Sequence, residues 1–223
     1  MTMPSTDTPP APQSPTAVAA RAIDAVKTYG EGDTAVHALA GISVDLVAGQ
    51  FTAIMGTSGS GKSTLMHCLA GLDELSSGSV WIEGTDLTQL REKDLTKLRR
   101  DRVGFVFQAF NLIPTLSAEE NILLPMSLAG RDPDQAWFDQ IVATVGLADR
   151  LDHRPSELSG GQQQRVAVAR ALASKPAIIF ADEPTGNLDS RASSEILSFM
   201  RRAVDEYNQT IVMVTHDPVA ASY

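Results

Sequence analysis

The chain has 223 residues, 43% of them hydrophobic and 20% charged, and its 18 Lys and Arg against 27 Asp and Glu give a formal net charge of −9. This composition excludes a wholly disordered or fibrous chain, because it supplies enough apolar side chains for a substantial core. The acidic balance disfavours duplex DNA or an anionic membrane as a direct ligand, since both attract basic surfaces. The single cysteine, Cys68, cannot form an internal disulfide and suits a reducing compartment.

The first 19 residues are predicted to be a disordered tail. Pro residues are frequent between Pro4 and Pro15, among Ser, Thr, Asp and Gln, and such a segment buries too little to offset its ordering entropy. It also lacks the basic and apolar regions of a signal peptide, and the later apolar runs are too short to span a bilayer. The sequence therefore predicts a cytoplasmic chain without direct lipid contact.

From residue 20 onward, short apolar runs alternate with helical patterns. The predicted strands are Ile23–Val26, Ile42–Val47, Phe51–Met55, Val80–Glu83, Val103–Phe107, Ile178–Asp182 and Ile211–Thr215. The predicted helices are Lys62–Ala70, Glu92–Arg100, Gln162–Ala173 and Arg191–Glu206. Strands that alternate with helices predict an α/β fold with a largely parallel sheet, and the early strands, which no helix separates, are expected to form an antiparallel flank.

Residues 109–160 are predicted to be an all-helical insertion between two parts of the core, residues 20–108 and 161–223. Ser117 and Glu120 form a capping-box pattern that opens one helix. Asp132-Pro133 predicts the start of a second helix, with the acid as the cap and proline at the first helical position.

A glycine-rich segment after the third predicted strand fits the pattern G-x-x-x-x-G-K-[ST] of a phosphate-binding loop. Its residues are Gly56, Thr57, Ser58, Gly59, Ser60, Gly61, Lys62, Ser63 and Thr64. Glycine allows successive backbone N–H groups to point at one oxyanion, and the following helix offers its positive dipole end. The Lys62 cation is placed for the β- and γ-phosphates, and the Ser63 hydroxyl is placed to bind Mg²⁺.

A second part of this site is predicted where the strand Ile178–Asp182 ends. Phosphate-binding loops use a carboxylate on a neighbouring strand to hold Mg²⁺, and Asp182 is in that position. Glu183 follows directly, where a carboxylate near the γ-phosphate can polarise an attacking water. A third phosphate-binding feature is the Ser159-Gly160-Gly161-Gln162 segment, at the start of a predicted helix.

Together with ADEPTGNLD at Ala181–Asp189 and with Thr215-His216-Asp217, these motifs resemble the nucleotide-binding subunits of ABC transporters over residues 20–223. The segments GFVFQAFNLIPTLSAEENILLP and LSGGQQQRVAVARAL are most similar to the macrolide-exporter, lipoprotein-releasing and FtsE-like group.

The resemblance implies a homodimer that closes head-to-tail around two ATP molecules with Mg²⁺. It implies that Tyr29 stacks on adenine, that Gln108 senses the γ-phosphate and Mg²⁺, and that His216 contacts the γ-phosphate. Glu183 would be the catalytic base. Ser159, Gly160, Gly161 and Gln162 would bind the ATP of the opposite subunit, with Asp189 at the seam of the dimer. A membrane permease would contact the region Phe110–Glu120.

The sequence departs from the family pattern in two places. Thr57 replaces a usual proline, for which we expect a small effect because the spacing is kept. The family usually continues past the histidine of the switch through a helix and further strands. The resemblance therefore predicts either a product truncated at Tyr223 or the loss of that part, and in both cases poor folding or weak ATPase activity.

An alternative is a soluble ABC-type ATPase that acts on nucleic acid or ribosomes. Chromosome and repair ATPases of that type insert long coiled coils, whereas residues 63–157, between Lys62 and Leu158, number 95 and show no sustained heptads. The basic residues between Arg91 and Arg102 alternate with acids, which is typical of a solvated, ion-paired face. The sequence therefore favours the transporter subunit and predicts no nucleic-acid partner.

Overall fold

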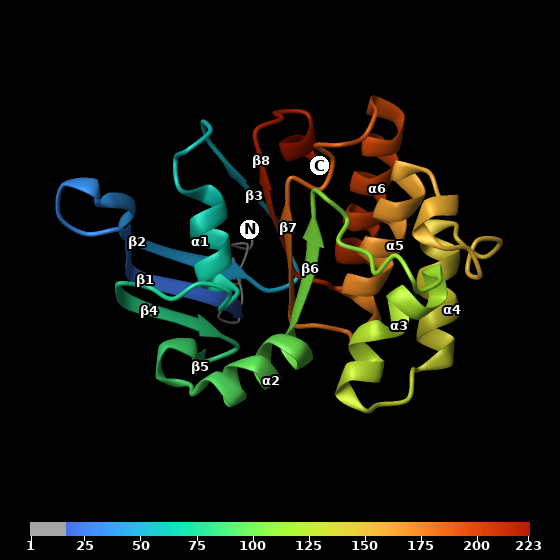
Figure 1. The fold of residues 1–223 in the computed structure, drawn as a ribbon, viewed down its shortest axis with the longest axis horizontal. Helices are drawn as coiled ribbons and strands as arrows, with labels where there is room; N and C mark the ends of the chain where they lie inside the picture. The colour runs from blue at the N-terminus through green and yellow to red at the C-terminus, as the bar shows by residue number, and fades with distance from the viewer. Residues whose placement is uncertain (1–16) are drawn as a thin grey trace, which may run out of the picture.

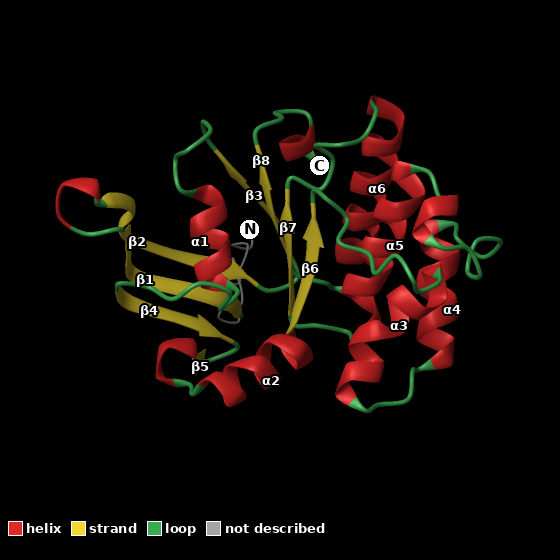
Figure 2. Cartoon of the chain, in the orientation of Figure 1, coloured by secondary structure: helices red, strands yellow, loops and turns green. Residues whose placement is uncertain are grey.

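The computed structural model describes residues 17–223 and contains two four-stranded sheets with helices packed around them (Figures 1 and 2). The first 16 residues of the predicted tail lie outside the described residues. The predicted boundary of the tail at residue 19 is wrong, because Val18 and Ala19 already belong to the first strand and Ala19 is buried.

The first sheet is antiparallel and has the order β2-β1-β4-β5. Its strands are β1 (Val18–Tyr29), β2 (Val36–Val47), β4 (Ser77–Ile82) and β5 (Thr85–Asp86). Short 3₁₀ turns, η1 (Gly32–Thr34) and η2 (Leu87–Gln89), join or follow these strands. The predicted antiparallel flank is thereby confirmed, although β1 and β2 are much longer than the apolar runs that predicted them.

The second sheet is parallel and has the order β3-β8-β7-β6. Its strands are β3 (Phe51–Met55), β6 (Val103–Phe107), β7 (Ile178–Asp182) and β8 (Ile211–Thr215), with the bounds that the sequence predicts. Side chains of a strand alternate between its faces. In β7, Ile178 and Phe180 join the core shared with the antiparallel sheet, and Ile179 and Ala181 join the core under the helices. Burial on both faces explains why this strand is a continuous apolar run.

The helices divide between the two sides of the parallel sheet (Figure 1). They are α1 (Lys62–Leu69), α2 (Glu92–Arg102), α3 (Ala118–Ala129), α4 (Gln135–Val145), α5 (Gly160–Ala173) and α6 (Ser190–Tyr207), with 3₁₀ turns η3 (Pro155–Glu157) and η4 (Ala220–Ser222). The helix α1 packs between the two sheets, whereas α3 to α6 gather on the opposite side, where α5 lies against α3, α4 and β6.

Of the two helix starts predicted in the region 109–160, one is confirmed and the other is wrong. The Ser117 capping box at the start of α3 is confirmed, with side-chain bonds in both directions to Glu120. The predicted start of α4 at Asp132-Pro133 is wrong. Asp134 is the cap instead, because its carboxylate accepts from the Trp137 N–H at 3.1 Å and is also held by Lys175 at 2.8 Å.

Candidate functional site

The phosphate-binding loop lies between the end of β3 and the start of α1, at the carboxyl edge of the parallel sheet. Its last glycine, Gly61, has a φ of 89°, and a Cβ there would come 2.3 Å from the backbone oxygen of Ala38. Only glycine fits that position without moving the backbone. The Lys62 ammonium donates to the Thr57 carbonyl at 2.7 Å, so it lies over the loop.

Ser63 and Asp182 meet at this edge. The Ser63 hydroxyl donates to the Asp182 carboxylate at 3.1 Å, although 118 residues separate them in the chain and only the sheet brings them together. His67 on α1 lies 3.7 Å from the same carboxylate. A hydroxyl and a carboxylate oxygen suit Mg²⁺, which keeps most of its waters and takes few protein ligands. Within residues 17–223 there is no cluster of three or more His, Cys, Asp or Glu that would form a different metal centre.

Glu183 and His216 form the second contact at the edge. Their side chains are 3.1 Å apart, between His216 Nδ1 and Glu183 Oε1, with the carboxyl group partly buried and the imidazole exposed. Glu183 has a φ of 44°, a left-handed backbone that costs a non-glycine residue about 1–2 kcal/mol. Hydrogen bonds from its N–H to Val214 and from Gly186 to its carbonyl hold that conformation. The arrangement holds the Glu183 carboxylate against His216, one residue after Asp182 in the chain, and a carboxylate can accept a proton from a bound water.

Gln108 follows the end of β6 but does not join the Ser63–Asp182 pair. Its amide donates to the Asn187 side chain at 3.2 Å, and the Asn187 amide donates back to the Gln108 carbonyl at 3.0 Å. Gly186 allows this approach, because a Cβ there would lie 2.7 Å from the Gln108 amide nitrogen. The structure therefore links Gln108 to the segment after β7.

Tyr29 lies at the end of β1, with its ring exposed and its hydroxyl bonded to Asp73 at 2.5 Å. Asp73 follows α1, so this bond links the ring to the helix that begins at the phosphate-binding loop.

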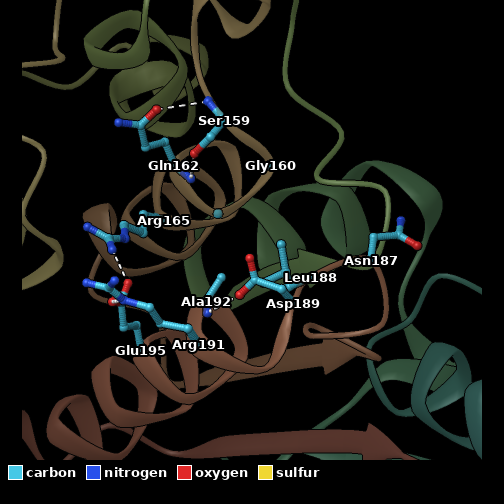
Figure 3. Close-up of a pocket in the computed structure, with 11 residues that line it drawn as sticks. Ser159, Gly160, Gln162, Arg165, Asn187, Leu188, Asp189, Arg191, Ala192 and Glu195 are labelled. Atoms are coloured by element: carbon cyan, nitrogen blue, oxygen red, sulfur yellow. Dashed lines mark hydrogen bonds and ion pairs between the residues drawn. The ribbon is translucent and has the colours of Figure 1, made fainter.

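The Ser159–Gln162 segment forms the start of α5 and lines an open groove of about 410 Å³ (Figure 3). Ser159 and Gln162 form a reciprocal capping box, at 3.3 and 2.8 Å. Asp189 caps α6 through the Ala192 N–H at 2.8 Å and faces the same groove, with Arg165 and Glu195 paired at its far end. The groove brings the starts of two helices together, and both offer positive dipole ends.

The structure also shows buried polar residues that sequence reasoning missed. Gln164 is fully buried in α5 and donates to the carbonyls of Phe107 and Pro184, where β6 and β7 end. Asn121 is fully buried in α3 and bonds the backbone at Ile113 in both directions. A glutamine within a run of three and a lone asparagine in a helix carry no sequence signal that separates them from surface residues.

A family model described as ABC transporter matches residues 39–186, more than half of the chain. The chain belongs to the ABC transporter family. It is an ABC-type ATPase, and the transporter interpretation is confirmed over the alternative of a nucleic-acid or ribosome ATPase.

Three relatives illustrate the group within this family. The chain is 47% identical to the bacitracin export ATP-binding protein BceA of Halalkalibacterium halodurans, covering 88% of this chain and 79% of that one. It is 44% identical to the lipoprotein-releasing system ATP-binding protein LolD of Geobacter metallireducens, with 90% of each chain covered. A third relative, the macrolide export ATP-binding/permease protein MacB of Syntrophobacter fumaroxidans, is 48% identical over 89% of this chain but only 28% of its own length.

Two solved structures share the fold. The dimeric structure of MJ0796, a bacterial ABC transporter cassette, has a TM-score of 0.82 and 41% identity, covering 91% of this chain and 90% of that one. A dimeric post-hydrolysis state of the same cassette, bound to ADP and Pi, has a TM-score of 0.81 and 40% identity over the same shares. The predicted fold class is confirmed. Between residues 17 and 223, this ABC cassette has no helix with both the length and the apolar character needed to cross a bilayer.

Proposed function

We propose that the chain is the ATP-hydrolysing subunit of a membrane exporter or of a membrane complex that transmits mechanical work, and that it acts as a head-to-tail homodimer with one ATP at each seam. The observation that carries this proposal is the convergence of Ser63, Asp182, Glu183 and His216 at one edge of the parallel sheet, beside the phosphate-binding loop.

Each group at the edge has a specific task. Backbone N–H groups of residues 56–64 and the Lys62 ammonium bind the phosphates of ATP, and the Tyr29 ring stacks on the base. Ser63 and Asp182 would hold Mg²⁺, with Gln108 reaching the ion after it leaves Asn187. When bound, Mg²⁺ neutralises charge on the phosphate oxygens. Glu183 orients the attacking water and accepts its proton, and His216 fixes the Glu183 carboxylate and reaches the γ-phosphate.

The groove of Ser159–Gln162 and Asp189 would complete the site of a second copy. Its phosphate-binding groups face the solvent, and Ser159 and Asp189 are exposed. In the proposed dimer they contact the γ-phosphate of the ATP held on the opposite phosphate-binding loop. ATP thereby joins the two copies, and its hydrolysis releases them.

The permease would contact the region Phe110–Glu120 from the cytoplasmic face of the membrane. Beside this region lies an open cavity of about 350 Å³, lined by apolar side chains that include Phe105, Phe107, Leu124 and Leu128. Leu128 is 70% exposed, which is unusual for so large an apolar side chain and suits contact with another protein. Transport would then follow from movement of this surface when the dimer closes.

Glu183→Gln tests the proposed chemistry. The amide keeps the size and the position of the carboxylate but cannot accept a proton, so ATP binding should persist while turnover falls by roughly 10³-fold. Gel filtration with ATP should show a stable dimer of the variant. Glu206→Gln, on the exposed face of α6, is the matched control and should behave as the parent. Turnover of Glu183→Gln at the parental rate would contradict the assignment of Glu183.

Leu128→Glu tests the proposed permease contact. A charge in the apolar cavity should reduce retention of the chain on its membrane partner at least tenfold, as measured by co-purification. Leu72→Glu, which changes another exposed leucine at the end of α1, is the control. Equal retention of both variants would contradict the proposed contact surface.

A further inference from the structure

Tyr29 is held by two charged neighbours. Its hydroxyl donates to Asp73 Oδ2 at 2.5 Å, and the Lys27 ammonium donates to Asp73 Oδ1 at 2.6 Å. The same ammonium lies 4.8 Å from the centre of the Tyr29 ring, within the range of a cation–π contact. Lys27 and Tyr29 are two residues apart on β1, so their side chains share one face of the strand.

Asp73 belongs to the segment that follows α1, the helix that begins at the phosphate-binding loop. The N–H groups of Leu72 and Asp73 both donate to the His67 carbonyl, at 2.8 and 3.3 Å, which fixes Asp73 to the last turn of α1. The carbonyl of Glu74 accepts a second bond from Lys27 at 2.6 Å. A continuous set of short bonds therefore runs from the end of α1 to the hydroxyl of Tyr29.

The charges of Asp73 and Lys27 beside Tyr29 balance one another. Burial by itself raises the pKa of Asp73, but the hydrogen bonds from Lys27 and Tyr29 outweigh burial and leave that pKa below its ordinary value. The hydrogen bond to Asp73 raises the pKa of the Lys27 ammonium and of the Tyr29 hydroxyl. At neutral pH the carboxylate and the ammonium are both charged and compensate one another, so they add no net repulsion toward a polyphosphate.

We propose that Asp73 and Lys27 are positioning residues that fix the Tyr29 ring relative to the phosphate-binding loop, so that one nucleotide can reach both. This inference rests on the proposed contact of Tyr29 with the base. The chain directly after Tyr29 contains Gly30 and Gly32, both with positive φ, and β1 ends there. Without the bonds to Asp73, the ring would lie at the free end of a strand and its ordering would oppose ATP binding. With them, the position of the ring is set by α1.

Asp73→Asn is the main test. An amide has one acceptor oxygen, so it can accept from Tyr29 or from Lys27 but cannot replace the carboxylate toward both. We expect the KM for ATP to rise about five- to tenfold, with kcat within about twofold of the parent. Inorganic tripolyphosphate, which has the phosphates but no base, should inhibit the variant and the parent with the same constant. Asp45→Asn, which changes the exposed Arg21–Asp45 pair on the same sheet, is the control and should leave the KM unchanged.

Tyr29→Phe gives a second, independent route. It keeps the ring and removes only the hydroxyl, so it should raise the KM without a loss of thermal stability, even if Asp73→Asn folds poorly. Adding Asp73→Asn to Tyr29→Phe should raise the KM less than it does in the parent, because the shared bond is already absent. The proposal would be overturned if Asp73→Asn raised the KM for ATP equally in the parent and in Tyr29→Phe. It would also be overturned if Asp73→Asn weakened tripolyphosphate binding as much as it weakened ATP binding.

Tyr29→Ala distinguishes a failure of the base contact from a failure of the positioning role of Asp73. If it leaves the Kd for ATP unchanged, the proposed contact between Tyr29 and the base is wrong. If it weakens ATP binding while Asp73→Asn and Tyr29→Phe both match the Asp45→Asn control, the contact with the base stands and the positioning role of Asp73 is wrong.

Discussion

The edge of the parallel sheet and the groove at the start of α5 both present groups that we propose bind phosphate, but they are built in different ways. At the edge, side chains from separate elements contact one another directly, as Ser63 does with Asp182 and Glu183 with His216. In the groove, Arg165 and Glu195 pair between α5 and α6, but within residues 17–223 the groups proposed to bind phosphate form no bonds between elements. Ser159 bonds within the first turn of α5, and Asp189 caps α6. In our proposal, the edge is a reaction centre assembled within one chain. The groove is a preformed surface whose partner, in our proposal, comes from a second copy.

Replacing an aspartate in each region should give the largest contrast. Asp182→Asn removes a charged oxygen from the proposed Mg²⁺ ligands, and we expect turnover to fall by roughly 10²–10³-fold at low Mg²⁺. Asp189→Asn keeps the cap of α6, because asparagine caps a helix as well as aspartate does. The free energy of unfolding should therefore change by less than about 0.5 kcal/mol. Steady-state ATPase assays over a Mg²⁺ titration, with urea unfolding of both variants, measure the contrast. Equal turnover of both variants would contradict it.

Glycine should be needed for different reasons in the two regions. In Gly61→Ala the new Cβ meets the Ala38 oxygen in a left-handed backbone, so the free energy of unfolding should fall by about 2–4 kcal/mol. In Gly160→Ala the nearest atom, Phe110 Cζ, is 3.7 Å from the Cβ. Because alanine favours a helix more than glycine does, stability should be kept or rise by up to about 1 kcal/mol. Urea titrations of the two variants test this, and similar losses would be the contrary result.

A change at the contact between α5 and the region Phe110–Glu120 should reduce stability by a smaller amount. Arg170 donates to the carbonyls of Phe110 and Asn111, at 2.9 and 2.6 Å, and both residues have positive φ. Arg170→Lys cannot span both carbonyls, since an ammonium lacks the planar fork. We expect the free energy of unfolding to fall by about 1–2 kcal/mol, and the amide hydrogens of Phe110 and Asn111 to exchange faster. Unchanged exchange there would show that Arg170 does not hold this segment.

The smallest effect concerns Cys68. It is buried in α1, and burial raises the pKa of its thiol to about 11. Because the folded pKa lies above the ordinary value, the thiol stays protonated at neutral pH, and its contribution to stability is lost only as the pH rises from about 9 toward 11. A disulfide reagent at pH 8 should modify folded Cys68 at least about 100-fold more slowly than the chain in urea. Equal rates would contradict its burial.

The sequence predicted the parallel sheet well because its strands appear as apolar runs with sharp ends, and β7 and β8 are buried on both faces. It predicted β1 and β2 too short, because the missed residues include five alanines, which have a low preference for strands. The pairing of these strands, with several bulges, is also a property of the sheet. The start of α4 was predicted two residues early. Asp132 and Asp134 both fit a cap, and only the contacts of Asp134 with Trp137 and Lys175 decide between them.

Most residues of the candidate site were predictable because their spacing reflects chemistry, as in the loop before Lys62. The bonds between distant residues were not. Gln108 pairs with Asn187, and Tyr29 with Asp73, only because the sheets bring separate segments together. Neither pair is periodic or close in sequence, so no local pattern reports it.

In our proposal the groove of one chain completes the site of another, and the decisive experiment is the Gly160→Asp variant in the Glu183→Gln background. The Cβ of the new residue has ordinary space, and an acid at the start of α5 suits the helix dipole, so the chain should fold. The same acid would repel a γ-phosphate. We expect ATP to bind each phosphate-binding loop with a Kd within about threefold of Glu183→Gln, while gel filtration with ATP shows monomer. Gln135→Glu, in the first turn of α4, is the control and should leave the dimer intact. A dimer that persists in the Gly160→Asp variant would contradict the claim.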